Sequence, residues 1–272
     1  MMTADEKQTF KTAYAAEALL NKIPEYKRRL AAQKPVIHHI TNFVTMYQCA
    51  RVTAFLGAAP IMAFAADETI QVVSKSNALV VNTGTLNDEV IRSIPKALSC
   101  ANARNIPVVL DPVGARLSDY RFNFIRSLLE NFHFDVIRCN GAELLNLHGE
   151  TTPGKGIDGA TLSPEIPQAA AEVAKTWGCV TACTGPVDYI SDGVTTLALS
   201  RGVPQLPKLV GTGCMVNSII ASYLSVADNT LEAAALGVLT MCAAGEAAAV
   251  RLTDASQLCS FETFLMDQIA ML

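Results

Sequence analysis

The 272-residue sequence predicts an α/β fold with a mostly parallel central sheet and helices on its faces. Short apolar runs alternate along the chain with longer amphipathic segments. Each short run ends in polar or small residues, as expected where strands reach the ligand-binding edge of such a sheet. Half of the residues are apolar and 17% are charged, which suits a sizeable buried core.

Six apolar runs fit buried strands of a parallel sheet. They are Pro35–Ile40, Pro60–Phe64, Ala78–Asn82, Ile106–Leu110, Val136–Asn140 and Val180–Thr184. The later segment Tyr189–Ser200 holds two β-rich halves around Ser191-Asp192-Gly193. This turn signal predicts an antiparallel hairpin at one edge of the sheet.

Helical patterns fill the intervals and the end of the chain. They are Thr12–Lys34, Asn42–Phe55, Asp88–Ala103, Arg121–Asn131, Ala142–Leu147, Pro167–Trp177, Gly213–Val226, Leu231–Leu252 and Ser260–Ala270. The first is expected to break or kink near Pro24. The most apolar window, Ala233–Val250, contains Glu246 and favours a buried helix over a membrane span. With no linker or repeat to divide it, residues 1–272 are expected to form a single domain.

The composition points to a small-molecule substrate. A net charge of −4, a pI of about 5.6 and scattered Lys and Arg argue against nucleic-acid and membrane partners. The apolar content favours a homo-oligomer. A polar start at Ala4–Gln8 lacks a secretion signal, so a cytoplasmic location is expected. The eight cysteines show no paired CxxC spacing and are interpreted as reduced thiols, a cytosolic pattern.

The segment Gly211-Thr212-Gly213-Cys214 leads directly into an apolar, helix-like run. Two glycines allow backbone N–H groups to approach a ligand, and the helix start adds further unpaired N–H groups and its positive dipole end. An anion would be held there. A thiolate at Cys214 would be stabilised by the same helix start, although a glycine loop with a buried cysteine fits these residues too.

Four predicted strands end in polar or glycine-rich residues. These residues are expected along one edge of the sheet, at the carboxyl ends of the strands, which we call the rim. The blocks are Asn82-Thr83-Gly84-Thr85-Leu86, Asp111-Pro112-Val113-Gly114-Ala115, Ile137-Arg138 with Asn140 and Glu143, and Thr184-Gly185. Together with His39-Ile40-Thr41-Asn42, the segment Leu56–Met62 and the Gly-Thr-Gly-Cys turn, they span nearly the whole chain. In this order the sequence resembles the hydroxyethylthiazole kinases, thiamine-salvage enzymes of the ribokinase-like superfamily.

The resemblance implies a three-layer α/β/α sandwich without a lid, and a homotrimer with active sites at subunit interfaces. It implies that Met62 and Gly211 line the thiazole pocket and that Asn42 reaches in from a neighbouring subunit. Arg138 and Thr184 correspond to ATP contacts. The implied reaction is Mg·ATP-dependent phosphorylation of 4-methyl-5-(2-hydroxyethyl)thiazole.

The residue chemistry agrees with phosphoryl transfer. Arg138 can fork to phosphate oxygens, and the Gly211–Gly213 turn supplies fixed dipoles. Asn140 and Glu143, three apart at a strand-to-helix turn, could hold Mg²⁺ directly or through its waters, or Glu143 could simply favour its own helix start. Cys214 stands where the superfamily has an aspartate base, and a thiol is a mediocre one, which predicts a slow kinase.

Three positions depart from the family pattern beside the nucleotide rim: Arg116, Cys139 and Gly141. Three alternatives therefore stay open. One is a related small-alcohol kinase of the hydroxymethylpyrimidine type, and another is a non-catalytic nucleotide-binding protein. The third is a thiol-nucleophile enzyme using Cys214, for which no histidine motif supplies the base.

Overall fold

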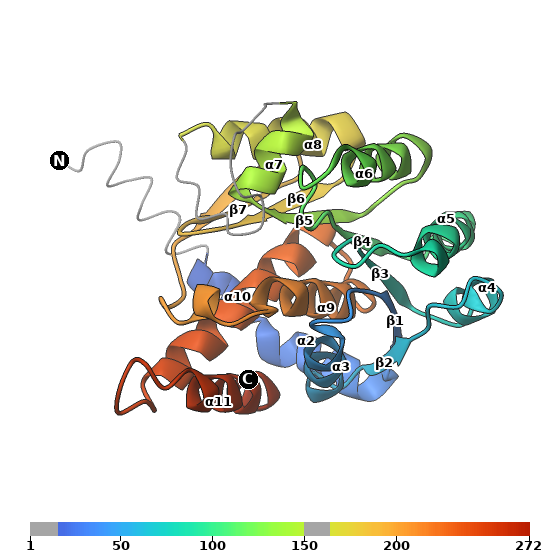
Figure 1. The fold of residues 1–272 in the computed structure, drawn as a ribbon. Coiled ribbons are helices and arrows are strands. Elements are labelled where there is room, and N and C mark those ends of the chain that lie inside the picture. The colour runs from blue at the N-terminus through green and yellow to red at the C-terminus, as the bar shows by residue number, and fades with distance from the viewer. Residues whose placement is uncertain (1–15, 150–163) are drawn as a thin grey trace.

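The computed structural model describes residues 16–149 and 164–272, in which one eight-stranded sheet lies between two groups of helices (Figure 1). The strand order is β2-β1-β3-β4-β5-β6-β7-β8. β1 to β6 are mutually parallel, and β7 and β8 add antiparallel pairs at one edge. The strands are β1 Val36–Ile40, β2 Ala59–Met62, β3 Ala78–Asn82, β4 Val108–Asp111, β5 Val136–Asn140, β6 Val180–Thr184, β7 Asp188–Ser191 and β8 Thr196–Leu199. The predicted α/β fold and edge hairpin are confirmed.

The helices follow the predicted segments closely. They are α2 Ile23–Gln33, α3 Met46–Phe55, α4 Thr69–Val73, α5 Asp88–Ala103, α6 Asp119–Asn131, α7 Gly141–His148, α8 Ile166–Trp177, α9 Thr212–Leu224, α10 Thr230–Ala249 and α11 Leu258–Met271, with a 3₁₀ turn at Leu206–Lys208. The break expected near Pro24 is a turn at residues 21–22, and Pro24 lies in the first turn of α2. Residues 12–15 of that expected helix and the polar start Ala4–Gln8 lie outside the described residues.

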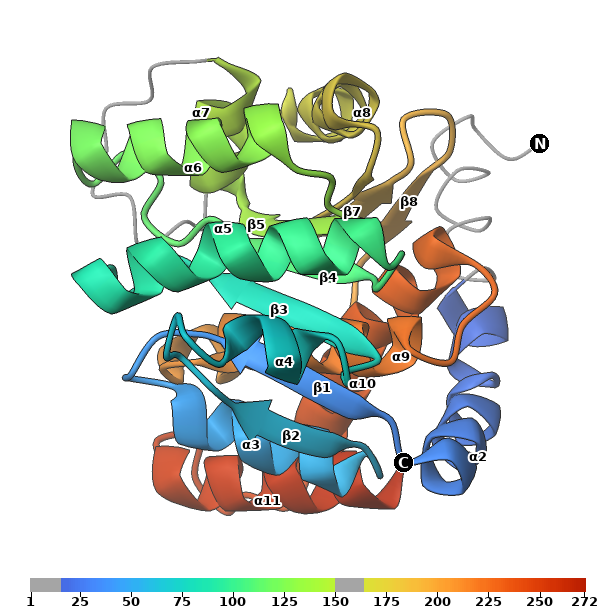
Figure 2. The ribbon, with the colours of Figure 1, turned by 90° about the vertical axis from the view of Figure 1, so that its right-hand side faces the viewer.

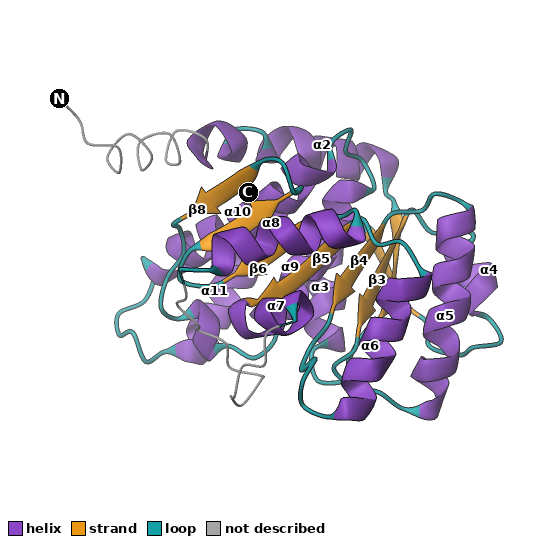
Figure 3. Ribbon diagram, turned by 90° about the horizontal axis from the view of Figure 1, so that it is seen from above, coloured by secondary structure: helices purple, strands orange, loops and turns teal. Residues whose placement is uncertain are grey.

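Strand side chains alternate between two cores, one on each face of the sheet. Val80 and Val109 pack with α2, α3, α9, α10 and α11, whereas Leu79 and Leu110 pack with α5 to α8. Figure 2 shows α5 in front of β3 and β4, and Figure 3 shows helices on both sides of the strands. The sandwich is therefore three-layered, as the resemblance implies.

The apolar helix α10 is long enough to cross a membrane by length and composition. However, 72% of its most apolar window is buried inside the fold, where it packs against α9 and α11. The core-helix interpretation of this segment is therefore confirmed.

Two local differences from the predicted elements occur around β2. The helix expected over Asn42–Phe55 begins only at Met46, because the side chain of Asn42 accepts hydrogen bonds from the backbone N–H groups of Val44 and Thr45. This turn competes with helix. The short helix α4 was not predicted, since five residues are too few to show a clear period.

The strand order places one reversal between β1 and β3. From β1 the chain moves outward to β2, returns to β3 on the other side of β1, and then proceeds strand by strand to β6. In open parallel sheets, ligands bind outside the carboxyl ends of the strands at such a switch point. The loops after β1 and β3, which begin at Thr41 and Thr83, therefore mark where a ligand site is expected.

Candidate active site

Helix α9 begins at this switch point and packs on β1, β3 and β4. Gly211 precedes it with φ of +99°, a left-handed conformation that suits glycine, and its α-carbon lies against Thr45. The N–H of Met215 closes the first helical turn on the Gly211 carbonyl at 2.8 Å. Within the described residues, the N–H groups of Thr212, Gly213 and Cys214 have no acceptor. A helix start with open N–H groups is therefore present, and its binding of an anion stays a prediction.

The Thr212 side chain points to the preceding 3₁₀ turn, so only its backbone N–H is open at the start of α9. Its hydroxyl donates toward the carbonyl oxygens of Leu206 and Leu209, at 3.2 and 3.4 Å. These bonds tie the start of α9 to the preceding 3₁₀ turn.

The sulfur of Cys214 faces two side-chain amides. Asn42 Nδ2 lies 3.3 Å from Sγ and Asn82 Nδ2 lies 3.4 Å from it. Burial raises the pKa of the Cys214 thiol, and the nearby carboxyl of Asp111 raises it further. A hydrogen bond with Thr45, the charge of Arg138 and the amide of Asn42 lower this pKa. The sulfur is thus placed to accept hydrogen bonds while being held mostly protonated.

Asn42 belongs to the site of its own chain. Its amide donates both to Cys214 and to Asn82 within one chain, at 3.3 and 3.1 Å. The turn before α3 thus brings Asn42 beside Cys214 of its own chain, and its predicted contribution to a neighbouring subunit stays a prediction.

Asp111 is a site residue that sequence reasoning did not select. This fully buried carboxylate at the end of β4 accepts hydrogen bonds on Oδ2 from Asn82, at 2.8 Å, and from Asn217 of α9. Its Oδ1 has no partner within the described residues, and Nη1 of Arg138 lies 3.9 Å from Oδ2. Burial raises the pKa of Asp111, while Arg138 lowers it. An ionisable residue directly after the apolar run Val108–Leu110 was the available signal.

Arg138 and Thr184 lie side by side on β5 and β6. A guanidinium nitrogen of Arg138 donates to the Thr184 hydroxyl, and Nε has no partner within the described residues. Arg138 also packs against Gly213, where any side chain would collide with the guanidinium. The two predicted ATP contacts and the Gly-Thr-Gly turn therefore meet, and the glycine is required for Arg138 to reach the start of α9.

Asn140 and Glu143 form a capping box at the start of α7. Asn140 Oδ1 accepts from the Glu143 N–H and Glu143 Oε2 accepts from the Asn140 N–H, each at 2.9 Å, while Oε1 accepts from the N–H of Gly114 at 3.0 Å. Burial and the charge of Asp111 raise the pKa of Glu143 to about 7. The carboxyls of Glu143 and Asp111 thus oppose each other's ionisation, and a cation nearby would relieve that repulsion. The described residues hold no cluster of three or more His, Cys, Asp or Glu that could bind a metal ion.

Met62 ends the edge strand β2, in register with His39 of β1. It is half-buried on the same rim, but within the described residues no hydrogen-bond, ion-pair or ring contact joins it to the residues around Cys214. The structure therefore places Met62 near the edge of the rim and leaves its role a prediction.

The three departures from the family pattern have separate surroundings. Arg116 stacks on the ring of Phe122, 3.9 Å from its centroid, Cys139 is buried opposite Cys183 on β6, and Gly141 is the buried first residue of α7. Arg116 thus projects toward α6. The hydrogen bonds of His38 and His39 go to Ala63, Ile37, Ser218 and Thr53 rather than to Cys214.

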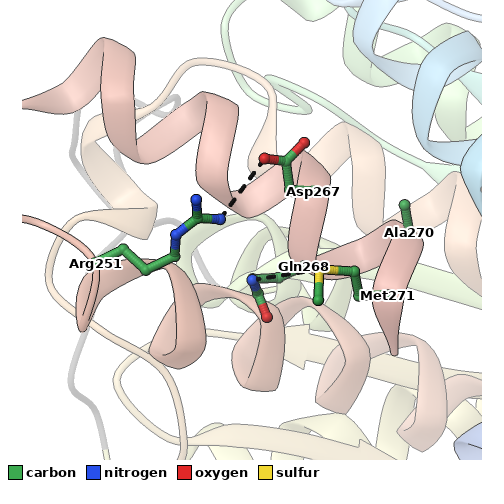
Figure 4. A pocket seen from close by; sticks show the side chains of 5 residues that line it. All are labelled: Arg251, Asp267, Gln268, Ala270 and Met271. Carbon is green, nitrogen blue, oxygen red and sulfur yellow. Dashed lines mark hydrogen bonds and ion pairs between the residues drawn. The ribbon is translucent and has the colours of Figure 1, made fainter.

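A surface hollow elsewhere belongs to α11 and the end of α10 (Figure 4). Arg251 and Asp267 form an ion pair across it at 3.7 Å, beside Gln268, Ala270 and Met271. These elements supply none of the strand-end residues, so the hollow is separate from the rim.

Comparison with known proteins places the chain in a family. Residues 28–272 match the family model described as "HK: Hydroxyethylthiazole kinase family". The chain is 40% identical over 241 residues to a hydroxyethylthiazole kinase of Alkaliphilus metalliredigens, covering 89% of each chain. It is 38% identical to one of Methanosarcina acetivorans, covering 87% of this chain and 89% of the relative.

Solved structures agree. A hydroxyethylthiazole kinase protein from Pyrococcus horikoshii OT3 superposes with a TM-score of 0.83 at 32% identity, over 93% of this chain and 94% of that one. A ribokinase-like superfamily protein from Enterococcus faecalis superposes with a TM-score of 0.61 at 15% identity, over 91% and 90%, and shares the fold alone. The chain belongs to the hydroxyethylthiazole kinase family, and it is a phosphotransferase that acts on the thiazole alcohol of thiamine salvage.

Proposed function

We propose that this chain transfers the γ-phosphoryl group of Mg·ATP to the primary alcohol of 4-methyl-5-(2-hydroxyethyl)thiazole, giving the thiazole phosphate and ADP. One observation carries the mechanism: the open N–H groups at the start of α9 lie beside a thiol and a carboxylate at the switch point of the sheet. An anion and an alcohol can therefore meet at one place. Phosphoryl transfer needs that geometry and little covalent chemistry from the protein.

The phosphate side is supplied by Arg138, Thr184 and the Gly211–Gly213 turn. Backbone N–H groups fixed by the helix start neutralise charge without having to reorganise. The guanidinium of Arg138, held against Gly213, adds a forked donor next to them. Thr184 orients that guanidinium through its hydroxyl.

The alcohol side is supplied by Cys214. Its sulfur accepts hydrogen bonds and can take the proton of the substrate hydroxyl. The raised pKa of the thiol makes it a weak base, but a loose transition state removes little of that proton before the phosphate bond breaks. This supports the expectation of a slow kinase.

Mg²⁺ is the proposed cofactor, held by Asn140 and Glu143 through its waters. When bound, it would neutralise phosphate charge during transfer. Glu143 would hold the ion in its ionised state. Its carboxylate oxygens accept hydrogen bonds from the N–H groups of Gly114 and Asn140, and these bonds fix the side chain at the carboxyl ends of the strands.

A homotrimer is proposed from an exposed apolar face. Large apolar side chains gather around β2, α3, α4 and the turn before α3, at Phe43, Val44, Tyr47, Phe55, Ile61 and Ile70. Faces of this kind mark subunit contacts. This face is continuous with Met62, so a neighbouring chain packed on it would complete the thiazole pocket opened by Gly211. We further propose that the enzyme works in the cytoplasm as one domain over residues 1–272.

An ADP-release assay with Mg·ATP and a panel of small primary alcohols tests the reaction. The hydroxyethylthiazole is expected to give the highest kcat/KM. Turnover of a hydroxymethylpyrimidine with none of the thiazole would reject the substrate assignment. ATP binding without any turnover would support the non-catalytic alternative instead.

A further inference from the structure

Asn82 is a buried residue at the end of β3 whose amide makes four hydrogen bonds. Its Nδ2 donates to Asp111 Oδ2 at 2.8 Å and to Cys214 Sγ at 3.4 Å. Its Oδ1 accepts from the Gly84 N–H at 2.9 Å and from Asn42 Nδ2 at 3.1 Å. One side chain thus joins β4, α9 and the loops after β1 and β3.

The orientation of this amide is fixed by its neighbours. A backbone N–H can only donate, so the side-chain atom facing Gly84 must be the oxygen, and the nitrogen then faces Asp111 and Cys214. The same reasoning fixes Asn42, whose Oδ1 accepts from the N–H groups of Val44 and Thr45 at 3.0 Å each. The sulfur of Cys214 therefore meets two amide N–H donors, and it also interacts with the Thr45 hydroxyl and the Asp111 carboxyl.

The charges around the sulfur oppose one another. Asp111 from β4 disfavours a thiolate, whereas the Thr45 hydroxyl and the charge of Arg138 from β5 favour it, and the buried thiol of Cys49 from α3 is near enough to interact electrostatically with Cys214. One N–H of Asn82 points to the sulfur and the other to the carboxylate. Asn82 is thus bound both to the proposed proton acceptor and to the carboxylate that opposes its ionisation.

We propose that Asn82 is a positioning residue for phosphoryl transfer, whose amide, bonded to both the Cys214 sulfur and the Asp111 carboxylate, holds the sulfur as an acceptor for the substrate alcohol. The proposal rests on the proposed role of Cys214. Asn82 itself touches neither the nucleotide nor the alcohol in this scheme.

The direct test is the pH dependence of Cys214 alkylation by iodoacetamide, followed by peptide mass spectrometry. Exposed Cys259 serves as an internal reference in each sample. In Asn82→Ala, the midpoint for Cys214 should rise by about one pH unit, because a charge-assisted donor to the thiolate is lost. The kcat should fall by roughly 10-fold to 100-fold, with the ATP KM within about twofold.

Asn217→Ala is the matched control, since Asn217 also donates to Asp111 Oδ2 but makes no hydrogen bond to the sulfur. Its Cys214 midpoint should not rise. A well-folded Asn82→Ala protein with the wild-type midpoint and kcat would overturn the proposal, as would equal upward shifts in both variants.

Asn82→Asp covers the case in which the alanine variant does not fold. It keeps the shape and the acceptor oxygen but replaces the donor by a carboxylate oxygen, so the midpoint should rise further than in Asn82→Ala. No rise in Asn82→Asp would also overturn the proposal. Because alkylation needs no turnover, this readout remains interpretable even if the wild-type enzyme phosphorylates a different alcohol.

Discussion

The two halves of the active site differ in how many of their polar groups have partners. On the thiol side, the amides of Asn42 and Asn82 use every donor and acceptor they have. On the phosphate side, three N–H groups at the start of α9 and Nε of Arg138 have no partner within residues 16–149 and 164–272. Asp111 lies between, with Oδ2 bonded and Oδ1 free of partners among those residues.

The difference indicates separate tasks. Nε of Arg138 is buried without a partner among the described residues, which costs free energy, and an anion that accepted from it and from the partly buried N–H groups of α9 would offset that cost. The amides of Asn42 and Asn82 have all their hydrogen bonds made, so moving them would break several bonds at once. They therefore keep the Cys214 sulfur in one position. The phosphate half is arranged to be completed by its substrate, whereas the thiol half is complete without one.

Among the changes considered, removing Arg138 from the phosphate half should have the largest effect on kcat. Arg138→Ala deletes the guanidinium that lies against Gly213 at the start of α9, so kcat should fall by about 100-fold to 1,000-fold and the ATP KM should rise. The thiazole KM should hardly move. Steady-state kinetics with each substrate varied in turn provides the measurement.

Arg126→Ala is a suitable control for that loss, because Arg126 forms only an exposed pair with Glu130 on α6. Its kinetics should match the wild type. An Arg138→Ala enzyme that folds and keeps its ATP dependence would remove Arg138 from the phosphate half.

A smaller change at Gly213 should disturb the same half without deleting a charge. Gly213→Ala places a methyl group where the guanidinium of Arg138 lies, so kcat should fall by about 10-fold to 100-fold through misplacement alone. Gly185→Ala is the matched control, since its added methyl meets only the Val187 carbonyl at 3.6 Å. Equal kinetics for the two variants would mean that Arg138 can shift without cost.

Cys214 tests the thiol half. Cys214→Asp should keep or raise kcat, because an ionised acceptor would receive the same two amide donors, and Cys214→Ser should lose about tenfold. A covalent thiol mechanism requires both variants to lose activity by roughly thousands-fold. Inactive, folded Cys214→Asp would count against the role of weak base.

Sequence reasoning located the phosphate half better than the thiol half. The Gly-Thr-Gly turn and Arg138 each carry a local signal: a backbone need for glycine before a helix, and a cation at the end of a buried strand. Asn82 and Asp111 carry only the signal of a polar residue at a strand end, and nothing local links them to Asn217, because these residues meet only through the order of the strands and the packing of α9 on β3 and β4.

Asn217 shows why such residues are missed. It lies in the second turn of α9 within an apolar run, where a single polar residue is compatible with an ordinary core position. Only the placement of α9 over the end of β4 brings its amide to Asp111. The place of Asn42 beside Cys214 of its own chain was not predicted for the same reason, since the turn before α3 depends on side-chain capping that helical periodicity does not reveal.

Glu143 offers a pH test at the border of the two halves. Its pKa is raised from an ordinary value of 4.5 to about 7 in the folded state, so the folded protein binds a proton more tightly than the unfolded chain. Stability from this group is present below about pH 4.5 and is lost as pH rises to about 7. Without Mg²⁺, the thermal stability of the wild type minus that of Glu143→Gln should therefore fall across this window.

Taking the difference removes contributions common to both proteins, including that of Asp188, whose pKa burial raises to about 6. Mg²⁺ should favour ionised Glu143 and raise the melting temperature of the wild type above pH 7, but not that of Glu143→Gln. A difference that is flat with pH would show that Glu143 ionises normally and acts only as a helix cap.

The smallest expected effect concerns the subunits. If Met62 completes a pocket opened by Gly211 of a neighbouring chain, mixing inactive Met62→Ala and Gly211→Val proteins after mild dissociation should restore part of the activity, since some mixed sites then have both native residues. The control mixture is Asn42→Ala with Gly211→Val. Asn42 lies beside Cys214 in the same chain as Gly211, so every mixed site keeps one defect.

Recovery in the first mixture and none in the control would assign Met62 to the neighbour's pocket and the whole amide network to a single chain. Subunit exchange should be verified by native mass spectrometry of the mixtures. Exchange without recovery in either mixture would mean that Met62 serves its own chain, and the exposed face around β2 would then bind subunits without completing the active site.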